Sequence, residues 1–401
     1  MAQMMTGKQA VLEMLKAEGV THIFGNPGTS EGPIMDMLGD YPELEYHLTL
    51  QESVAVGMGE SYARSTETAS CVILHVDSGL ANGICLMLDA LNTGTPMVVM
   101  SANYDARKVN ETMTDLAELV RPVTKWSVEL DLADSIPSVL RRAFHEANSH
   151  PRGPVYVGFS ANALDEEGTY EFFSPSPITY GNRANNNAIT DAVQTLKTAK
   201  NPAFVVGDRI SQSSAWNEIV ELSDLSGAAV YASSYSEMNF PNDHPNYKGE
   251  IRLGYPEGKK MMEKHDAVFA IGKLSTGYWM FSNPSPSFFQ PKTKFVHIDV
   301  DSSNLGSYLK TDIPILSDPK TALEEITNGL SEVIDGEYKE SASLRTKQYS
   351  IDKSKNILLE KKINVLSLSV VRRDGSITPF KSEKISNAIK KAFLAQTKIR
   401  N

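Results

Sequence analysis

Residues 48–82 constrain the fold of this chain more than any other stretch. Two short apolar runs, at residues 48–50 and 72–74, predict buried strands. Residues 53–64, which lie between them, predict a helix whose small residues allow neighbouring backbone to pack closely. The small residues are Ala55, Gly57, Gly59 and Ala63. Glu52 falls where the first strand ends and the helix begins, which is where α/β sheets usually bind ligands.

The alternation of strand and helix continues on both sides of this stretch. Apolar strand patterns recur at residues 21–24, 97–100 and 153–159, and an amphipathic helix is predicted at residues 6–18. The apolar face of that helix consists of Ala10, Val11, Met14 and Leu15. Alternation of this kind implies a parallel sheet with helices on both faces.

A second unit of the same kind follows a polar segment. Its predicted strands, at residues 203–208, 267–272 and 295–301, end in Gly or Asp. We therefore expect two α/β domains of the doubly wound parallel type, at residues 1–180 and 188–335.

The composition changes again near the C-terminus. The charged residues 336–364 indicate a linker or an exposed helix. Residues 370–380 predict a β-hairpin that turns on Asp374-Gly375, and residues 382–393 predict a helix. A short hairpin and helix, within residues 365–401, are thus expected to follow the two domains.

The composition also excludes several classes of protein. The 401-residue chain is 41% hydrophobic with a formal net charge of −10, which argues against binding nucleic acid or an anionic membrane. No apolar run is long enough to span a bilayer, and the N-terminus does not resemble a signal peptide, so we expect a cytoplasmic protein. Cys71 and Cys85 lie in apolar surroundings and are expected to be buried free thiols, without a disulfide or a metal site.

Four segments, taken in order, resemble a known family. Residues 19–29 contain a strand and an Asn-Pro-Gly-Thr loop, and residues 51–64 contain Gln-Glu followed by the helix glycines. Residues 90–100 and 120–126 continue the pattern. These motifs resemble the pyrimidine-binding domain of thiamine diphosphate enzymes, in the group of benzoylformate decarboxylase and acetolactate synthase. The second unit resembles the central domain of the same enzymes.

The resemblance implies an enzyme that uses thiamine diphosphate and Mg²⁺ to decarboxylate or carboligate a 2-oxo acid. It places Glu52 against the aminopyrimidine ring, where a carboxyl in apolar surroundings has its protonated form favoured and shares a proton with a ring nitrogen. It gives His75 a role in proton transfer. Without the resemblance, Glu52 only complements a helix dipole, and His75 is a satisfied structural residue.

The resemblance also assigns residues around the cofactor. These are Asn26, Pro27, Gly28, Thr29, Gly79 and Asn82. On spacing alone, residues 26–29 are equally well explained as a plain Pro-Gly turn. Asp77 and Ser78 depart from the Gly-Pro-Gly of relatives such as acetolactate synthase. No histidine stands at residues 277–280, where benzoylformate decarboxylase has its second active-site histidine.

The family holds Mg²⁺ and the diphosphate through a Gly-Asp-Gly motif followed by Asn, and this sequence contains no Gly-Asp-Gly. We therefore expect a domain absent from this chain to supply those ligands. Three explanations of its absence remain open. A partner chain supplies the domain, the chain is a remnant or a fusion product, or the reading frame joins pieces of two genes. The cofactor of the family lies between subunits. We accordingly expect a homo-oligomer or a separate diphosphate-binding subunit. We expect the first domain to self-associate through helices at residues 54–63 and 84–91, with Met87 in the interface, but burial within its own domain explains either helix taken singly equally well.

The C-terminal segment has a resemblance of its own. Residues 370–393 resemble the beginning of an ATP-cone, the nucleotide-sensing module of ribonucleotide reductases. In that module Arg372 and Arg373 would contact nucleotide phosphates, whereas alone they are solvated charges on a hairpin edge. The alternative function is therefore a catalytically silent regulatory protein that binds nucleotides.

Overall fold

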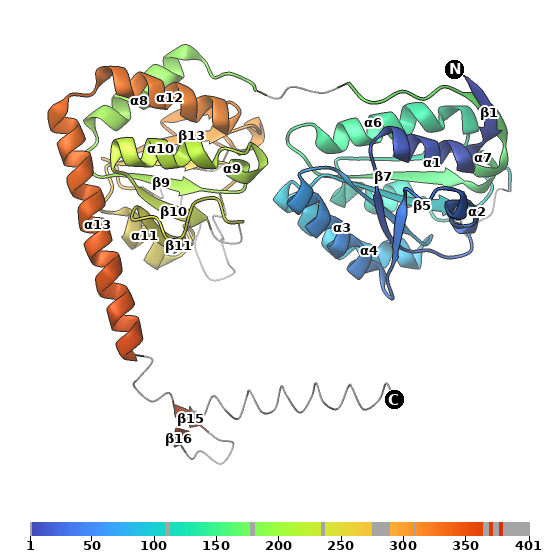
Figure 1. Ribbon diagram of the computed structural model, residues 1–401, viewed down its shortest axis with the longest axis horizontal. Coiled ribbons are helices and arrows are strands. Elements are labelled where there is room, and N and C mark those ends of the chain that lie inside the picture. The colour runs from blue at the N-terminus through green and yellow to red at the C-terminus, as the bar shows by residue number, and fades with distance from the viewer. Residues whose placement is uncertain are drawn as a thin grey trace.

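The computed structural model describes residues 2–108, 113–176, 181–233, 237–274, 289–307 and 309–363, together with two short strands at 369–371 and 377–379. Figure 1 shows two α/β domains, each with a central sheet between layers of helices. Each sheet has six strands, and every neighbouring pair within it is parallel. The predicted fold class of two doubly wound parallel-sheet domains is therefore confirmed.

The first domain is built on a sheet with the strand order β3-β2-β4-β5-β7-β6. Its strands are β2 (His22–Asn26), β3 (Glu45–Leu48), β4 (Ser70–Leu74), β5 (Met97–Asn103), β6 (Trp126–Leu130) and β7 (Pro154–Ser160). Its helices are α1 (Gly7–Ala17), α2 (Gly32–Met37), α3 (Glu52–Thr66), α4 (Ser78–Thr93), α5 (Leu116–Val120), α6 (Ile136–Asn148) and α7 (Ala161–Asp165). Short 3₁₀ turns lie at η1 (Leu38–Asp40), η2 (Arg121–Val123) and η3 (Ala133–Ser135), and β1 (Gln3–Thr6) pairs with β8 (Glu167–Tyr170) in a separate antiparallel ribbon.

Alternating side chains of the central strands fill two cores, one on each face of this sheet. Ile23 and Ile73 point toward α1 and α6, whereas Phe24 and Val72 point toward α3 and α4. The predicted apolar face of α1 is confirmed, because Ala10, Val11, Met14 and Leu15 are all buried. In α3 the glycines permit close packing as predicted, since a Cβ at Gly59 would lie 2.7 Å from Val72 Cγ2.

Two predictions about burial in the first domain are wrong. Residues 48–50 do not form a buried strand, because β3 is the edge strand and ends at Leu48, whose side chain is 67% exposed. Leu50 lies in the turn that follows and is 97% exposed. Cys71 is buried as expected, but Cys85 lies on the outer side of α4 and is exposed.

The second domain has the strand order β11-β10-β9-β12-β13-β14. Its strands are β9 (Pro202–Val206), β10 (Ala229–Ser233), β11 (Tyr247–Ile251), β12 (Ala267–Ile271), β13 (Lys294–Asp299) and β14 (Ile313–Leu316). Its helices are α8 (Asn186–Thr198), α9 (Arg209–Gln212), α10 (Trp216–Ser226), α11 (Pro256–Met262) and α12 (Pro319–Val333), with a 3₁₀ turn at η4 (Ser302–Asn304). Two cores again cover the two faces of the sheet.

The C-terminal part of the chain begins with a long helix. Residues 336–363 form α13 (Gly336–Ile363), the helical one of the two alternatives considered for this charged segment. Its Arg345 donates to the carbonyls of Ser226 and Gly227, so the helix is tied to the end of α10. Beyond it, β15 (Ser369–Val371) and β16 (Ile377–Pro379) pair antiparallel, as a hairpin requires. The helix predicted at residues 382–393 lies outside the described residues.

None of the described helices combines the length and the apolar character needed to cross a bilayer.

Candidate active site

Glu52 is the first residue of α3 and lies at the carboxyl end of β3. The preceding Gln51 caps the helix, since its side chain accepts a hydrogen bond from the Val54 amide at 3.2 Å. The Glu52 side chain is buried, with 8% of the residue exposed. Its Oε1 accepts from Asn26 Nδ2 at 2.9 Å, and its Oε2 accepts from Asn82 Nδ2 at 3.0 Å. The carboxylate is thus held in one orientation by amides from two other elements.

The surroundings of Glu52 favour its ionised form, whereas the sequence led us to expect a favoured protonated form. Burial raises the pKa of this carboxyl, but the hydrogen bonds from Asn82 and Asn26 outweigh burial and hold the pKa below its ordinary value. The expectation of a carboxyl with its protonated form favoured is therefore wrong for the chain by itself. The reason is that donors satisfy the charged form, which an apolar interface alone would not do.

His75 follows β4 and is oriented by a second, fully buried carboxylate. Its Nδ1 lies 2.9 Å from Glu31 Oε2, and the same oxygen accepts from the Gly28 amide at 3.0 Å. Glu31 Oε1 accepts from the Ala102 amide at 2.9 Å. An ionised carboxylate only accepts hydrogen bonds. With Glu31 ionised, the proton of this contact therefore lies on His75 Nδ1, which leaves Nε2 for another group.

Glu31 was not identified from the sequence. It follows the turn at residues 26–29 and precedes Gly32-Pro33, a position where a glutamate is usually solvated. Its partner Ala102 lies 71 residues further along the chain, at the end of β5. Only the pairing of β2, β4 and β5 brings the two together.

Two of the predicted cofactor-binding glycines lie where a side chain would collide with the site. A Cβ at Gly28 would lie 2.2 Å from His75 Nδ1. A Cβ at Gly79 would lie 2.9 Å from His75 Cβ and 3.3 Å from Glu52 Oε1. These glycines let His75 and Glu52 lie close to the chain segments around them. Asp77 precedes Gly79 with φ 53° and ψ −97°, a strained backbone conformation at the start of α4.

The Gly28→Ala substitution should displace the His75 ring from Glu31. The added methyl group has no room beside the imidazole, so we expect a loss of about 1–3 kcal/mol in the free energy of unfolding. We also expect changed NMR chemical shifts of the His75 ring. Gly32→Ala is the matched control, because a Cβ at Gly32 would meet nothing within 4 Å. Equal behaviour of the two variants would contradict the close contact.

A cavity of about 780 Å³ lies next to His75, and only some of the predicted site residues line it. Thr29 and His75 line it together with Tyr104, Arg107 and Lys108. Asn26 and Asn82 instead contact Glu52, so in this structure they position the carboxylate. Arg372, Arg373 and residues 277–280 lie outside the described residues, and the predicted nucleotide contacts stay a prediction.

Known protein families match both domains of the chain. Residues 5–121 match the domain described as thiamine pyrophosphate enzyme, N-terminal TPP binding domain. Residues 189–326 match the domain described as thiamine pyrophosphate enzyme, central domain. The two matches together cover more than half of the chain. The chain belongs to the thiamine pyrophosphate (thiamine diphosphate) enzymes and contains their N-terminal and central domains.

Similar proteins fall into the two groups indicated by the motifs. The acetolactate synthase large subunit of Haemophilus influenzae is 26% identical over 82% of this chain and 58% of its own length. Benzoylformate decarboxylase of Pseudomonas aeruginosa is 28% identical over 70% of this chain and 54% of its own length. The crystal structure of benzoylformate decarboxylase from Polynucleobacter necessarius superimposes with a TM-score of 0.73 at 24% identity, over 80% of this chain and 61% of that one. The chain thus spans little more than half the length of these relatives.

Proposed function

We propose that this chain provides the aminopyrimidine-binding half of a thiamine diphosphate-dependent enzyme that decarboxylates or carboligates a 2-oxo acid. The observation that carries the proposal is Glu52, a buried carboxylate at the carboxyl edge of the sheet, held by two side-chain amides. In this proposal residues 1–180 form the pyrimidine-binding domain and residues 188–335 the central domain.

The donors and acceptors around Glu52 fit the cofactor. Each of its oxygens accepts one of these side-chain hydrogen bonds and has a second lone pair. Glu52 can therefore accept a further bond from a ring nitrogen while Asn26 and Asn82 keep it in place. The apolar side chains of Leu48, Leu50 and Val54 are exposed nearby on the same edge, as is expected where a flat heterocycle and a partner subunit cover the surface. When bound, thiamine diphosphate supplies a carbanion equivalent that adds to the carbonyl of the substrate.

His75 and the cavity beside it suit the substrate side of the reaction. Glu31 orients the imidazole so that Nε2 can give or take a proton in the cavity. Arg107 and Lys108, which also line this cavity, are cations that could neutralise the carboxylate of a 2-oxo acid. Arg107 also makes a two-point contact with Asp105, with distances of 2.9 and 2.7 Å, which holds its guanidinium in position.

We further propose that Mg²⁺ and the diphosphate are held by a different domain or a second subunit. Mg²⁺ prefers oxygen ligands in octahedral geometry. Within the described ranges, the one group of three or more His, Cys, Asp or Glu side chains close enough to share an ion contains two imidazoles. It is therefore unsuited to Mg²⁺.

The test of the proposed function is release of CO₂ from 2-oxo acids by the purified protein with thiamine diphosphate and Mg²⁺. The protein is assayed alone and mixed with a chain that carries a diphosphate-binding domain. Turnover in either sample that depends on thiamine diphosphate supports the proposal. Absence of cofactor binding in both samples would overturn it.

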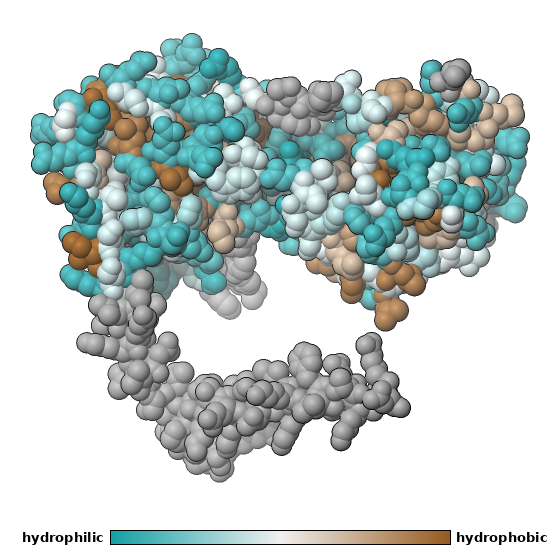
Figure 2. Space-filling view, viewed as in Figure 1, coloured by the Kyte–Doolittle hydropathy of each residue, from teal (hydrophilic) through white to brown (hydrophobic). Residues whose placement is uncertain are grey.

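A homo-oligomer is proposed through the outer surface of α3 and α4. Exposed apolar side chains gather there, and Figure 2 shows the corresponding apolar surface on the lower edge of the first domain. They are Val54 and Met58 of α3, Leu88 of α4, and Leu48 and Leu50 between the end of β3 and the start of α3. The expectation that Met87 lies in the interface is wrong. Met87 is on the inner side of α4, where it packs against the sheet and is completely buried. A charge at Met87 would therefore test folding and not association.

The Met58→Glu variant should shift the protein toward monomer in analytical ultracentrifugation at micromolar concentration. A symmetric interface brings the substituted position from both subunits into one contact region, so one substitution buries two charges. Leu132→Glu is the control, because Leu132 is exposed and follows β6, at the edge of the sheet opposite β3. A monomer before substitution, or the same shift in both variants, would contradict this interface.

A further inference from the structure

A second cluster of ionisable side chains lies on the outer part of the first sheet and has no role in the proposed reaction. It consists of His22 at the beginning of β2, and of Glu45 and His47 on the edge strand β3. Glu45 and His47 are two residues apart on one strand, so their side chains project from the same face of the sheet. The parallel register places His22 beside Glu45 and Phe24 beside His47, which brings all three side chains together.

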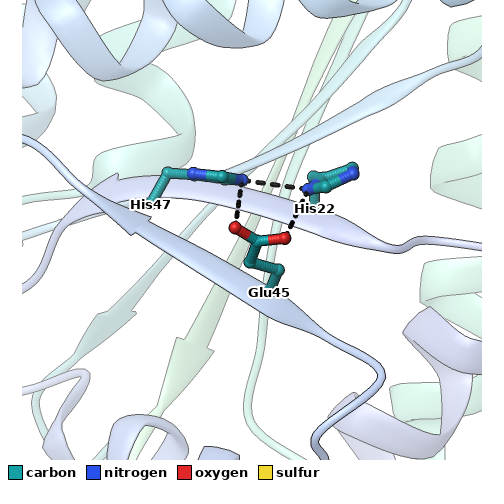
Figure 3. A group of neighbouring side chains, drawn as sticks. All are labelled: His22, Glu45 and His47. Carbon is teal, nitrogen blue, oxygen red and sulfur yellow. Dashed lines mark hydrogen bonds and ion pairs between the residues drawn. The ribbon is translucent and has the colours of Figure 1, made fainter.

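The three side chains converge on one point. Figure 3 shows a triangle of contacts between the two rings and the carboxylate. His22 Nδ1 lies 2.9 Å from His47 Nε2 and 3.7 Å from Glu45 Oε2. His47 Nε2 lies 3.8 Å from Glu45 Oε1. Each imidazole nitrogen thus faces its own oxygen of Glu45, and one ligand atom from each residue lies within 4.8 Å of the other two.

These separations match a small tetrahedral ion. Zinc binds imidazole nitrogen and carboxylate oxygen at about 2.0–2.2 Å, which in tetrahedral geometry places ligand atoms about 3.3–3.6 Å apart. The two imidazole nitrogens, 2.9 Å apart, are closer than this range, and each lies slightly beyond it, at 3.7 and 3.8 Å, from a different oxygen of Glu45. Binding of an ion would therefore require the rings to separate slightly and the Glu45 carboxylate to turn one oxygen toward both nitrogens. A hydrogen bond between the two imidazoles explains the shortest contact, but it does not explain why a carboxylate approaches both nitrogens.

The surroundings hold the two rings and leave one side open. Phe24 stacks on His47 with ring centroids 5.0 Å apart, and Tyr62 from α3 meets His22 edge-on at 5.2 Å. The histidine side chains are about one-third exposed and that of Glu45 is 65% exposed, so an ion can enter from solvent. Three protein ligands leave a fourth position for water or for a ligand group from another molecule.

We propose that His22, Glu45 and His47 form a zinc-binding site. Two imidazoles with one carboxylate are a donor set typical of Zn²⁺ and unsuited to Mg²⁺, which prefers oxygen. The site stands on the edge strand of the sheet, where it would join β2 to β3 through the metal. It is separate from the proposed reaction, so its occupancy does not depend on thiamine diphosphate.

Calorimetric titration of the chelator-treated full chain with ZnCl₂ tests the site. One Zn²⁺ per chain should bind with a dissociation constant below about 10 µM, and 5 mM Mg²⁺ should not displace it. His47→Gln should weaken binding at least a hundredfold. Glu45→Gln should weaken it at least tenfold and should not disturb folding, because Glu45 is largely exposed. Co²⁺ bound in place of Zn²⁺ should show the visible absorption of a four-coordinate ion.

His244→Gln is the matched control. His244 Nε2 lies 3.3 Å from Asp224 Oδ1, and among the described residues no third His, Cys, Asp or Glu side chain is close enough to share an ion with this pair. This variant should bind Zn²⁺ as the unchanged protein does. Binding weaker than 100 µM in the unchanged protein would overturn the proposal. Equal affinity of the Glu45→Gln and His47→Gln variants and the unchanged protein would also overturn it.

Discussion

The Glu52→Gln variant is expected to decarboxylate 2-oxo acids about 10²–10⁴-fold more slowly than the unchanged protein, under the conditions in which the latter turns over. The amide is nearly isosteric with the carboxylate but carries no negative charge, so it cannot share a proton with a ring nitrogen. Its NH₂ group would also face the donating amide of Asn26 or Asn82, each of which now contacts a carboxylate oxygen. The measurement is the rate of CO₂ release at saturating thiamine diphosphate.

Glu60→Gln is the matched control for this rate. Glu60 is on the same helix and is also buried, but it contacts Arg64 and Thr93 and not the residues around Glu52. Its replacement should leave the rate within a few-fold of the original. An unchanged rate in Glu52→Gln, with the fold intact by circular dichroism, would remove Glu52 from the reaction. An equal loss in both variants would indicate a general effect of buried carboxylates in α3.

The Glu31→Ala variant should lose the largest amount of stability among the substitutions considered. Truncation leaves the buried amide of Ala102, the partly buried amide of Gly28 and the His75 ring without the carboxylate that accepts from them. Breaking one side of such a buried charged network costs about 3–5 kcal/mol. Urea unfolding measures this loss. Hydrogen exchange should show faster exchange at the amides of Gly28 and Ala102 than at amides of the second domain.

Two further variants make this result specific. Glu31→Gln keeps one acceptor oxygen and should fall between the unchanged protein and Glu31→Ala. Glu118→Ala removes an exposed carboxylate that contacts Arg121 at 2.6 Å, and it should change stability little, because surface ion pairs contribute little. If Glu31→Ala were as mild as Glu118→Ala, the network around Glu31 would have no energetic role.

The sequence by itself determined the features that depend on short-range pattern. The period of apolar residues in 6–18 placed the buried face of α1, and alternating strand and helix patterns predicted two parallel sheets. Glu52 could be located at the start of α3 because the end of a strand and the beginning of a helix are both local events. Its structural position, directly after the cap Gln51, agrees with that prediction.

The tertiary structure decided everything that depends on strand order and on which face meets solvent. Leu48, Leu50 and Cys85 have apolar neighbours in sequence, yet β3 is an edge strand and α4 has an outer side, so all three are exposed. Glu31 meets Ala102, and His22 meets Glu45 and His47, only through pairing between strands distant in sequence. Side-chain period reveals one face of one element, whereas a site assembled from several elements requires their register.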